Sequence, residues 1–131
     1  MIVPDASVVV AALADNAGSG ALAREALTGV DLHAPHLLDV EVTAALRGRV
    51  RGGHLPADVA GSVLRDLAEL RVIRYPHAAL LGRMWQLREN LTPYDACYLA
   101  LAELLGATVV TGDQRMAAAP GLRCEVRVLT P

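Results

Sequence analysis

The sequence contains no lysine, and all 12 of its basic residues are arginine. Without lysine, the chain cannot use a phosphate-loop lysine, a Schiff base, or the lysine of phosphoacceptor and haloacid-type phosphatase sites. Arginine suits contacts to phosphate groups, although an all-arginine set is also typical of a genome with biased base composition. The net charge of −2 does not by itself indicate a nucleic-acid-binding protein.

Cysteine, aromatic residues and long apolar runs are also scarce. The two cysteines, Cys97 and Cys124, have no metal-binding spacing, which predicts reduced thiols and a cytoplasmic location. Phenylalanine is absent, so aliphatic side chains and alanine must fill the core. No run is long enough to span a membrane. Residues 1–13 contain an acidic residue and lack the positively charged start of a signal peptide. Neither a signal peptide nor a membrane partner is therefore expected.

The chain is nevertheless rich in apolar residues. Of its 131 residues 53% are hydrophobic, and the mean hydropathy is +0.36. This composition predicts one compact domain over residues 1–131 with a sizeable core. The apolar excess is also compatible with surface that a partner covers.

Short apolar runs alternate with helical patterns along the chain. Strands are predicted at 1–3, 30–34, 72–75, 107–111 and 125–129. Helices are predicted at 7–13, 18–27, 35–50, 59–70, 77–89, 91–105 and 114–119, with Ala45, Val59 and Leu81 on their buried faces. The alternation predicts a three-layer α/β/α domain with a central parallel sheet of four to five strands. Ligands of such sheets bind beyond the carboxyl ends of the strands, where the strand order reverses.

Four acidic residues lie where this fold places a ligand, and each also has an ordinary structural explanation. Asp5 follows the first strand and Asp113 follows the fourth, and both suit the cap of the next helix. Asp95 is third in its helix behind a Thr-Pro pair at 92–93, close to a capping box. Glu41 falls within the apolar stripe of its helix, where a carboxylate is costly unless it is paired or metal-bound. A narrower stripe would leave Glu41 at the surface.

Taken together, the four acids predict a shared ligand site, which no single one of them would predict. The carboxyl ends of parallel strands share one edge of the sheet, so all four carboxylates are expected to converge there. Clustered carboxylates repel one another unless cations neutralise them or some are protonated. An oxygen-only set of ligands suits Mg²⁺ or Mn²⁺ and disfavours zinc.

Four segments in this order, IVPDAS, LLDVEVTAAL, LTPYDACYLALAELLG and VVTGD, resemble the PIN-domain ribonucleases, especially the VapC toxins of prokaryotic toxin–antitoxin pairs. The resemblance covers essentially the whole chain, and YDACYLALAE followed by TGD is its most specific part. It implies that the catalytic, metal-binding quartet of the family is Asp5, Glu41, Asp95 and Asp113. It also implies that Ser7 and Thr111 are the hydroxyl residues beside the metal. Many members carry asparagine three residues after the helix glutamate, where this chain has Ala44.

The resemblance implies an Mg²⁺-dependent endoribonuclease, with Mn²⁺ as a substitute, that leaves a 5′-phosphate and a 3′-hydroxyl. It further implies the toxin of a type II pair, with a VapB-like antitoxin and a homodimer as its assemblies. Candidate RNA-binding residues are Arg115, just after TGD, and three arginines near the end of the Glu41 helix: Arg47, Arg49 and Arg51. An ion pair with Asp113 is the competing role for Arg115.

A DNA target stays open within the nuclease class, because a metal and carboxylates do not distinguish the sugar. Two other functions also stay open. The first is a non-catalytic module of the same fold that binds RNA or protein, and the complete acidic quartet argues against it. The second is metal-free RNA cleavage by paired imidazoles, for which His33 and His36 are the only close pair. Such cleavage would use the ribose 2′-hydroxyl, leave a cyclic phosphate and survive EDTA.

Overall fold

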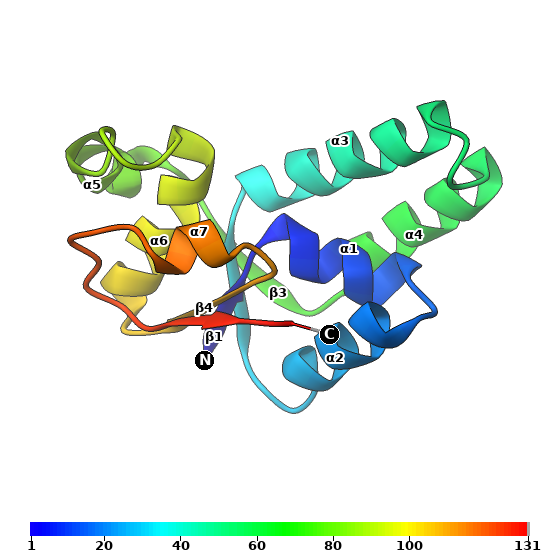
Figure 1. The fold of residues 1–131 in the computed structure, drawn as a ribbon, viewed down its shortest axis with the longest axis horizontal. Helices are drawn as coiled ribbons and strands as arrows, with labels where there is room; N and C mark the ends of the chain where they lie inside the picture. The colour runs from blue at the N-terminus through cyan, green and yellow to red at the C-terminus, as the bar shows by residue number, and fades with distance from the viewer. Residues whose placement is uncertain (131) are drawn as a thin grey trace.

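The computed structural model describes residues 1–130, and a sheet of five parallel strands lies at its centre (Figure 1). The strands are β1 (Ile2–Pro4), β2 (Leu32–Pro35), β3 (Val72–Tyr75), β4 (Thr108–Thr111) and β5 (Val126–Val128). Their order is β3-β2-β1-β4-β5, so β1 is central and the order reverses between β1 and β4. The predicted sheet is confirmed. Pro4 closes β1, where its missing N–H is tolerated.

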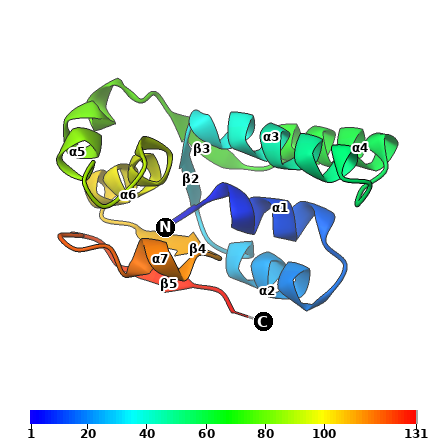
Figure 2. The same ribbon diagram turned by 45° about the horizontal axis from the view of Figure 1, so that its top comes forward.

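Helices cover both faces of the sheet, which completes the predicted three layers (Figures 1 and 2). One face carries α1 (Ala6–Ala14), α2 (Gly18–Leu27), α3 (Leu37–Arg51) and α4 (Ala57–Glu69). The other carries a short 3-10 turn (Ala78–Leu80), α5 (Leu81–Gln86) and α6 (Pro93–Leu105). The short α7 (Gln114–Ala117) follows β4. Within residues 1–130 no single helix is long and apolar enough to cross a membrane, and the one pair that would suffice by length and composition, α1 with α2, is bent by 113°.

Helix α6 is the main apolar element of the core, and its two ends are defined by the sequence. Thr92 is its N-cap, because the Thr92 hydroxyl accepts a hydrogen bond from the backbone N–H of Asp95 at 3.2 Å. Residues 96–102 are all buried. The helix ends at Gly106, whose φ of 67° is favourable only for glycine. The predicted capping role of the Thr-Pro pair is therefore confirmed.

The buried faces of α3 and α4 are narrower than the sequence predicts. In α3 only Leu38, Val42 and Leu46 are buried, a single row at i, i+4 and i+8. Ala45 is exposed, and Val59 of α4 is 41% exposed, so both expectations are wrong. A surface helix that packs along one line buries only the residues of that line.

The segment 77–89 is not one helix as predicted. It forms the 3-10 turn and the short α5, and ends in turns after Gln86. Arg83 of α5 faces α6, because its guanidinium pairs with Glu103 at 2.6 Å. Leu81 lies two residues away, on the opposite side of the helix, and is 57% exposed instead of buried. The rotation of α5 that brings Arg83 to Glu103 thus leaves Leu81 at the surface.

The start of α3 is capped from outside the helix. His36 occupies the N-cap position but makes no capping hydrogen bond with its side chain. Instead the backbone N–H of Leu37 donates to Nε2 of His77, which follows β3, at 3.0 Å. Because β2 and β3 are neighbours, the segment after β3 lies beside the segment after β2 and supplies this acceptor.

We expect His77→Ala to lower the free energy of unfolding by about 1 kcal/mol, the usual value of a helix cap. Urea denaturation followed by circular dichroism would measure the difference. His54→Ala is the matched control, because His54 is an exposed imidazole beyond the far end of the same helix. Equal stability of the two variants would show that the hydrogen bond to Leu37 contributes nothing.

Candidate active site

A cavity of about 470 Å³ opens at the carboxyl edge of the sheet, and all four predicted acids line it. We call it the acidic cavity. Its lining residues are Asp5, Ala6, Ser7, Glu41, Asp95, Tyr98, Gly112, Asp113 and Arg115. The segments after β1 and β4 meet here, at the point where the strand order reverses.

Asp5 is the buried centre of the site. As the N-cap of α1 it accepts a hydrogen bond from the backbone N–H of Val8, so its predicted capping role is confirmed. The same oxygen accepts from the hydroxyl of Ser7 at 2.6 Å. The other oxygen accepts from the hydroxyl of Thr111 at the end of β4. Three donors therefore fix this carboxylate, and about one of its four acceptor positions is left for a ligand.

Ser7 and Thr111, predicted to lie beside the site, join the two strand ends. The Ser7 hydroxyl accepts from the backbone N–H of Gly112 at 3.2 Å while it donates to Asp5. The Thr111 hydroxyl accepts from the backbone N–H of Asp113 at 3.0 Å. Both hydroxyls thus connect the Asp5 carboxylate to the turn that carries Asp113.

Glu41 lies at the edge of the buried row of α3, neither in the core nor fully in solvent. Its Oε1 accepts a hydrogen bond from the hydroxyl of Tyr98 at 2.6 Å. Burial raises the pKa of Glu41, and the charges of Asp95 and Asp5 raise it further, while the Tyr98 hydrogen bond opposes the rise. Glu41 is therefore a carboxylate held near other carboxylates in a partly buried place.

Asp95 combines the two roles that the sequence left open. Its backbone N–H bonds the Thr92 cap, and its side chain lines the acidic cavity. Burial raises the pKa of Asp95, and the negative charges of Asp113 and Asp5 add to the rise. A cation in the cavity would relieve this repulsion.

Asp113 and Arg115 form the exposed rim of the cavity. Asp113 caps α7 by accepting from the backbone N–H of Arg115 at 2.9 Å, and it also pairs with the Arg115 guanidinium at 3.3 Å. Hydrogen bonds from Arg115 hold the pKa of Asp113 below its ordinary value. The Arg115 side chain is 93% exposed, so it is accessible to a ligand.

The other predicted arginines and the histidine pair do not line the acidic cavity. Arg47, Arg49 and Arg51 lie in the last turns of α3, and Arg49 pairs with Asp15 at 2.6 Å. The ring of His33 is hydrogen-bonded to the hydroxyl of Tyr75 at 2.6 Å. His36 instead lies against His77, with 6.1 Å between the ring centres. The predicted pairing of His33 with His36 is therefore not supported, because each ring has a different neighbour.

The donor set of the acidic cavity is composed of oxygen atoms. In the part of the chain that the structure describes, no group of three or more His, Cys, Asp or Glu side chains is arranged to hold a metal ion. The carboxylates are nevertheless near enough to raise the pKa values of Glu41 and Asp95. Hard oxygen ligands around a space that favours positive charge fit a hydrated divalent cation such as Mg²⁺.

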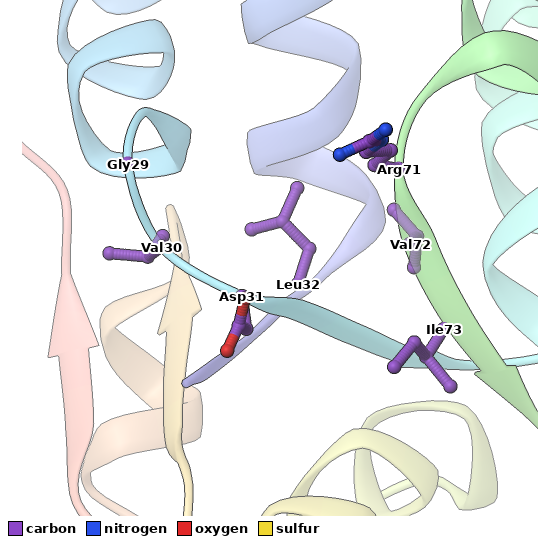
Figure 3. A pocket seen from close by; sticks show the side chains of 7 residues that line it. All are labelled: Gly29, Val30, Asp31, Leu32, Arg71, Val72 and Ile73. Carbon is purple, nitrogen blue, oxygen red and sulfur yellow. The ribbon is translucent and has the colours of Figure 1, made fainter.

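A second cavity of about 470 Å³ lies at the amino ends of β2 and β3 (Figure 3). Its lining residues are Gly29, Val30, Asp31, Leu32, Arg71, Val72 and Ile73. It contains one acidic residue, Asp31, directly before β2, and one basic residue, Arg71, directly before β3 (Figure 3). It thus lacks the clustered carboxylates of the acidic cavity.

The PIN domain model matches residues 2–122 of this sequence. The chain belongs to the PIN-domain family. Among curated relatives of this PIN domain, Ribonuclease VapC1 of Mycobacterium tuberculosis is 45% identical over 128 residues, which cover 97% of this chain and 96% of VapC1.

Two solved structures share the fold. VapC20 of Mycobacterium tuberculosis, a sarcin-ricin-loop-cleaving toxin, has a TM-score of 0.72 and 18% identity over 100% of both chains. VapBC2 of Rickettsia felis, bound to a DNA fragment from its promoter, has a TM-score of 0.71 and 16% identity over 99% of this chain and 100% of that chain. At these identities the likeness concerns the fold alone.

Tyr98 of this PIN domain lies in the helix predicted at 91–105, and the sequence patterns assign no role to its hydroxyl group. The side chain is buried, and its hydroxyl reaches Glu41 in the acidic cavity. A signal was present, because Tyr98 follows Asp95 by three residues and therefore shares its helix face. Gly112 also lines the cavity, between Thr111 and Asp113.

We expect Glu41→Gln to raise the thermal midpoint of unfolding at neutral pH when divalent ions are absent. The folded-state pKa of Glu41 lies above its ordinary value of 4.5. The folded protein therefore loses stability as pH rises through 4.5 to the raised pKa, and glutamine does not ionise. The gain should disappear below pH 4.5, where wild-type Glu41 is protonated in both states.

Differential scanning calorimetry in EDTA across this pH range would measure the effect. Glu69→Gln is the matched control, because Glu69 is an exposed glutamate at the end of α4. A Glu41→Gln midpoint at or below the wild-type value at neutral pH would contradict the raised pKa.

Proposed function

We propose that this chain is an Mg²⁺-dependent endoribonuclease and the toxin of a type II toxin–antitoxin pair. The observation that carries the proposal is the acidic cavity, in which four carboxylates line one space at the carboxyl edge of the sheet. The 45% identity to Ribonuclease VapC1 over 97% of the chain supports the same reaction class. An intact acidic quartet disfavours the alternative of a catalytically inactive binding module.

Asp5, Glu41, Asp95 and Asp113 are the residues that would hold the ion. Mg²⁺ keeps several of its waters and needs only one or two carboxylates from the protein, so joint ligation by all four is not required. When bound, the ion would supply a more acidic water and stabilise charge on the phosphate. Mn²⁺, which also prefers oxygen ligands, would substitute.

The remaining residues of the cavity would orient these ligands and the RNA. Ser7 and Thr111 hold the Asp5 carboxylate in one orientation through their hydroxyl groups. Arg115 lies at the rim with most of its side chain in solvent, where its guanidinium can contact a phosphate group. Of the arginines predicted to bind RNA, it is the one that lines the cavity.

The partners that fit this function are an RNA substrate, a VapB-like antitoxin and a second copy of the chain. The shared fold of the VapBC2 structure supports an antitoxin. Leu81 and Trp85, four residues apart on α5, are 57% and 68% exposed, which supports a covered surface such as a homodimer face. Two free cysteines agree with a reducing, cytoplasmic location.

We expect purified protein to cut a pool of cellular RNA with Mg²⁺ and not with EDTA. Asp95→Asn and Glu41→Gln should each reduce the cleavage rate by more than about 100-fold. Loss of a residue that only hydrogen-bonds a metal ligand typically costs roughly 10–100-fold, and loss of a ligand itself should cost more. Mapping of the fragment ends should show 5′-phosphates. Glu69→Gln serves as the control variant.

Three outcomes would contradict the proposal. Cutting that persists in EDTA and leaves cyclic phosphates would favour the histidine scheme. Undiminished cutting by folded Asp95→Asn protein would place the site elsewhere. No cutting by folded wild-type protein that is free of antitoxin, together with RNA binding, would favour the binding module.

We expect Arg115→Ala to weaken RNA binding and to make it less sensitive to salt. Loss of one phosphate contact to a single strand lowers the slope of log K against log salt by about 0.7. Fluorescence anisotropy in the Glu41→Gln background would measure this without cutting the RNA. Arg65→Ala, an exposed arginine of α4 that lies outside the cavity and is not among the predicted RNA-binding residues, is the matched control. Equal slopes for the two variants would exclude a phosphate contact by Arg115.

A further inference from the structure

Tyr98 is the least exposed of the side chains that reach the acidic cavity from the core. It is 1% exposed and lies within α6, one turn after Asp95. Its ring is packed in the hydrophobic core, and its hydroxyl lies 2.6 Å from Oε1 of Glu41. A ring fixed by the core therefore delivers one hydrogen-bond donor to a carboxylate on another helix.

The direction of this hydrogen bond is fixed by the chemistry of the two groups. The Tyr98 hydroxyl donates and Oε1 of Glu41 accepts. An ionised carboxylate has no proton to donate. Tyr98 therefore occupies one side of Oε1, and Oε2 is the oxygen that it leaves free.

We propose that Tyr98 is a positioning residue for the divalent cation: its hydroxyl holds Oε1 of Glu41, so that Oε2 is presented to the ion. This inference rests on the proposed function and adds a residue that acts through Glu41. The simpler alternative is a buried tyrosine whose hydroxyl has found a partner, with no influence on the ion.

The chain offers a matched pair of variants. Tyr98→Phe removes the hydroxyl and keeps the ring in the core. Tyr75→Phe removes another hydroxyl that is hydrogen-bonded at 2.6 Å, to His33 between β3 and β2, outside the acidic cavity. Calorimetric titration with Mg²⁺ or Mn²⁺ alone, without RNA, would measure ion affinity, and circular dichroism would check that both variants are folded.

We expect Tyr98→Phe to weaken ion binding by about 10–100-fold, the usual effect of losing an outer partner of a metal ligand. Tyr75→Phe should bind the ion as the wild type does. In cleavage assays the Mg²⁺ concentration for half-maximal rate should rise by a similar factor for Tyr98→Phe, with much of the rate recovered at saturating Mg²⁺.

A double-mutant cycle tests the route of the effect. In a Glu41→Gln background, Tyr98→Phe should change ion affinity far less than it does alone, because the two residues act as one unit. Equal ion affinity of Tyr98→Phe and wild type, or an equal loss in Tyr75→Phe, would overturn the inference while the proposed function stands. A folded wild type that binds neither ion would overturn both.

Discussion

The Asp5 carboxylate is the interaction on which the rest of the site depends. It caps α1, receives the Ser7 hydroxyl beside it, and receives the Thr111 hydroxyl from the neighbouring strand. These bonds join the ends of β1 and β4 at the point where the strand order reverses. Because the turn after β4 carries Asp113, the same bonds place Asp113 relative to Asp5. One buried carboxylate therefore has a structural and a chemical role at once.

Sequence reasoning succeeded where a residue's place follows from the topology of a parallel sheet. Asp5 and Asp113 follow β1 and β4, so their convergence could be predicted once the strands were recognised. The contacts of His77 with α3 and of Tyr98 with Glu41 could not be predicted, because each joins segments whose relative placement depends on three-dimensional packing. The expected burial of Leu81 was wrong for a similar reason, since the side of α5 that faces the core carries Arg83, which pairs with the distant residue Glu103.

The acidic cavity shows a conflict between stability and site chemistry. Partial burial and mutual repulsion raise the pKa values of Glu41 and Asp95, so the ionised forms destabilise the protein in the absence of a cation. The hydrogen bond from Tyr98 opposes the rise in the pKa of Glu41, and the charge of Arg115 opposes the rise in the pKa of Asp95. The protein thus keeps a cluster of carboxylates that lowers its stability, whereas apolar side chains at the same positions would not be charged.

The hydrogen bond between Asp5 and Thr111 joins residues that are 106 positions apart in the sequence. The central strand β1 likewise pairs with β4, which is formed near the other end of the chain. Contacts of such long range are slow to form, because bringing the two segments together costs conformational entropy before the contact is made. During synthesis, the acidic cavity therefore cannot be completed before β4 and Asp113 have been translated. A nascent or truncated chain that lacks β4 has the first acids of the site but not the site.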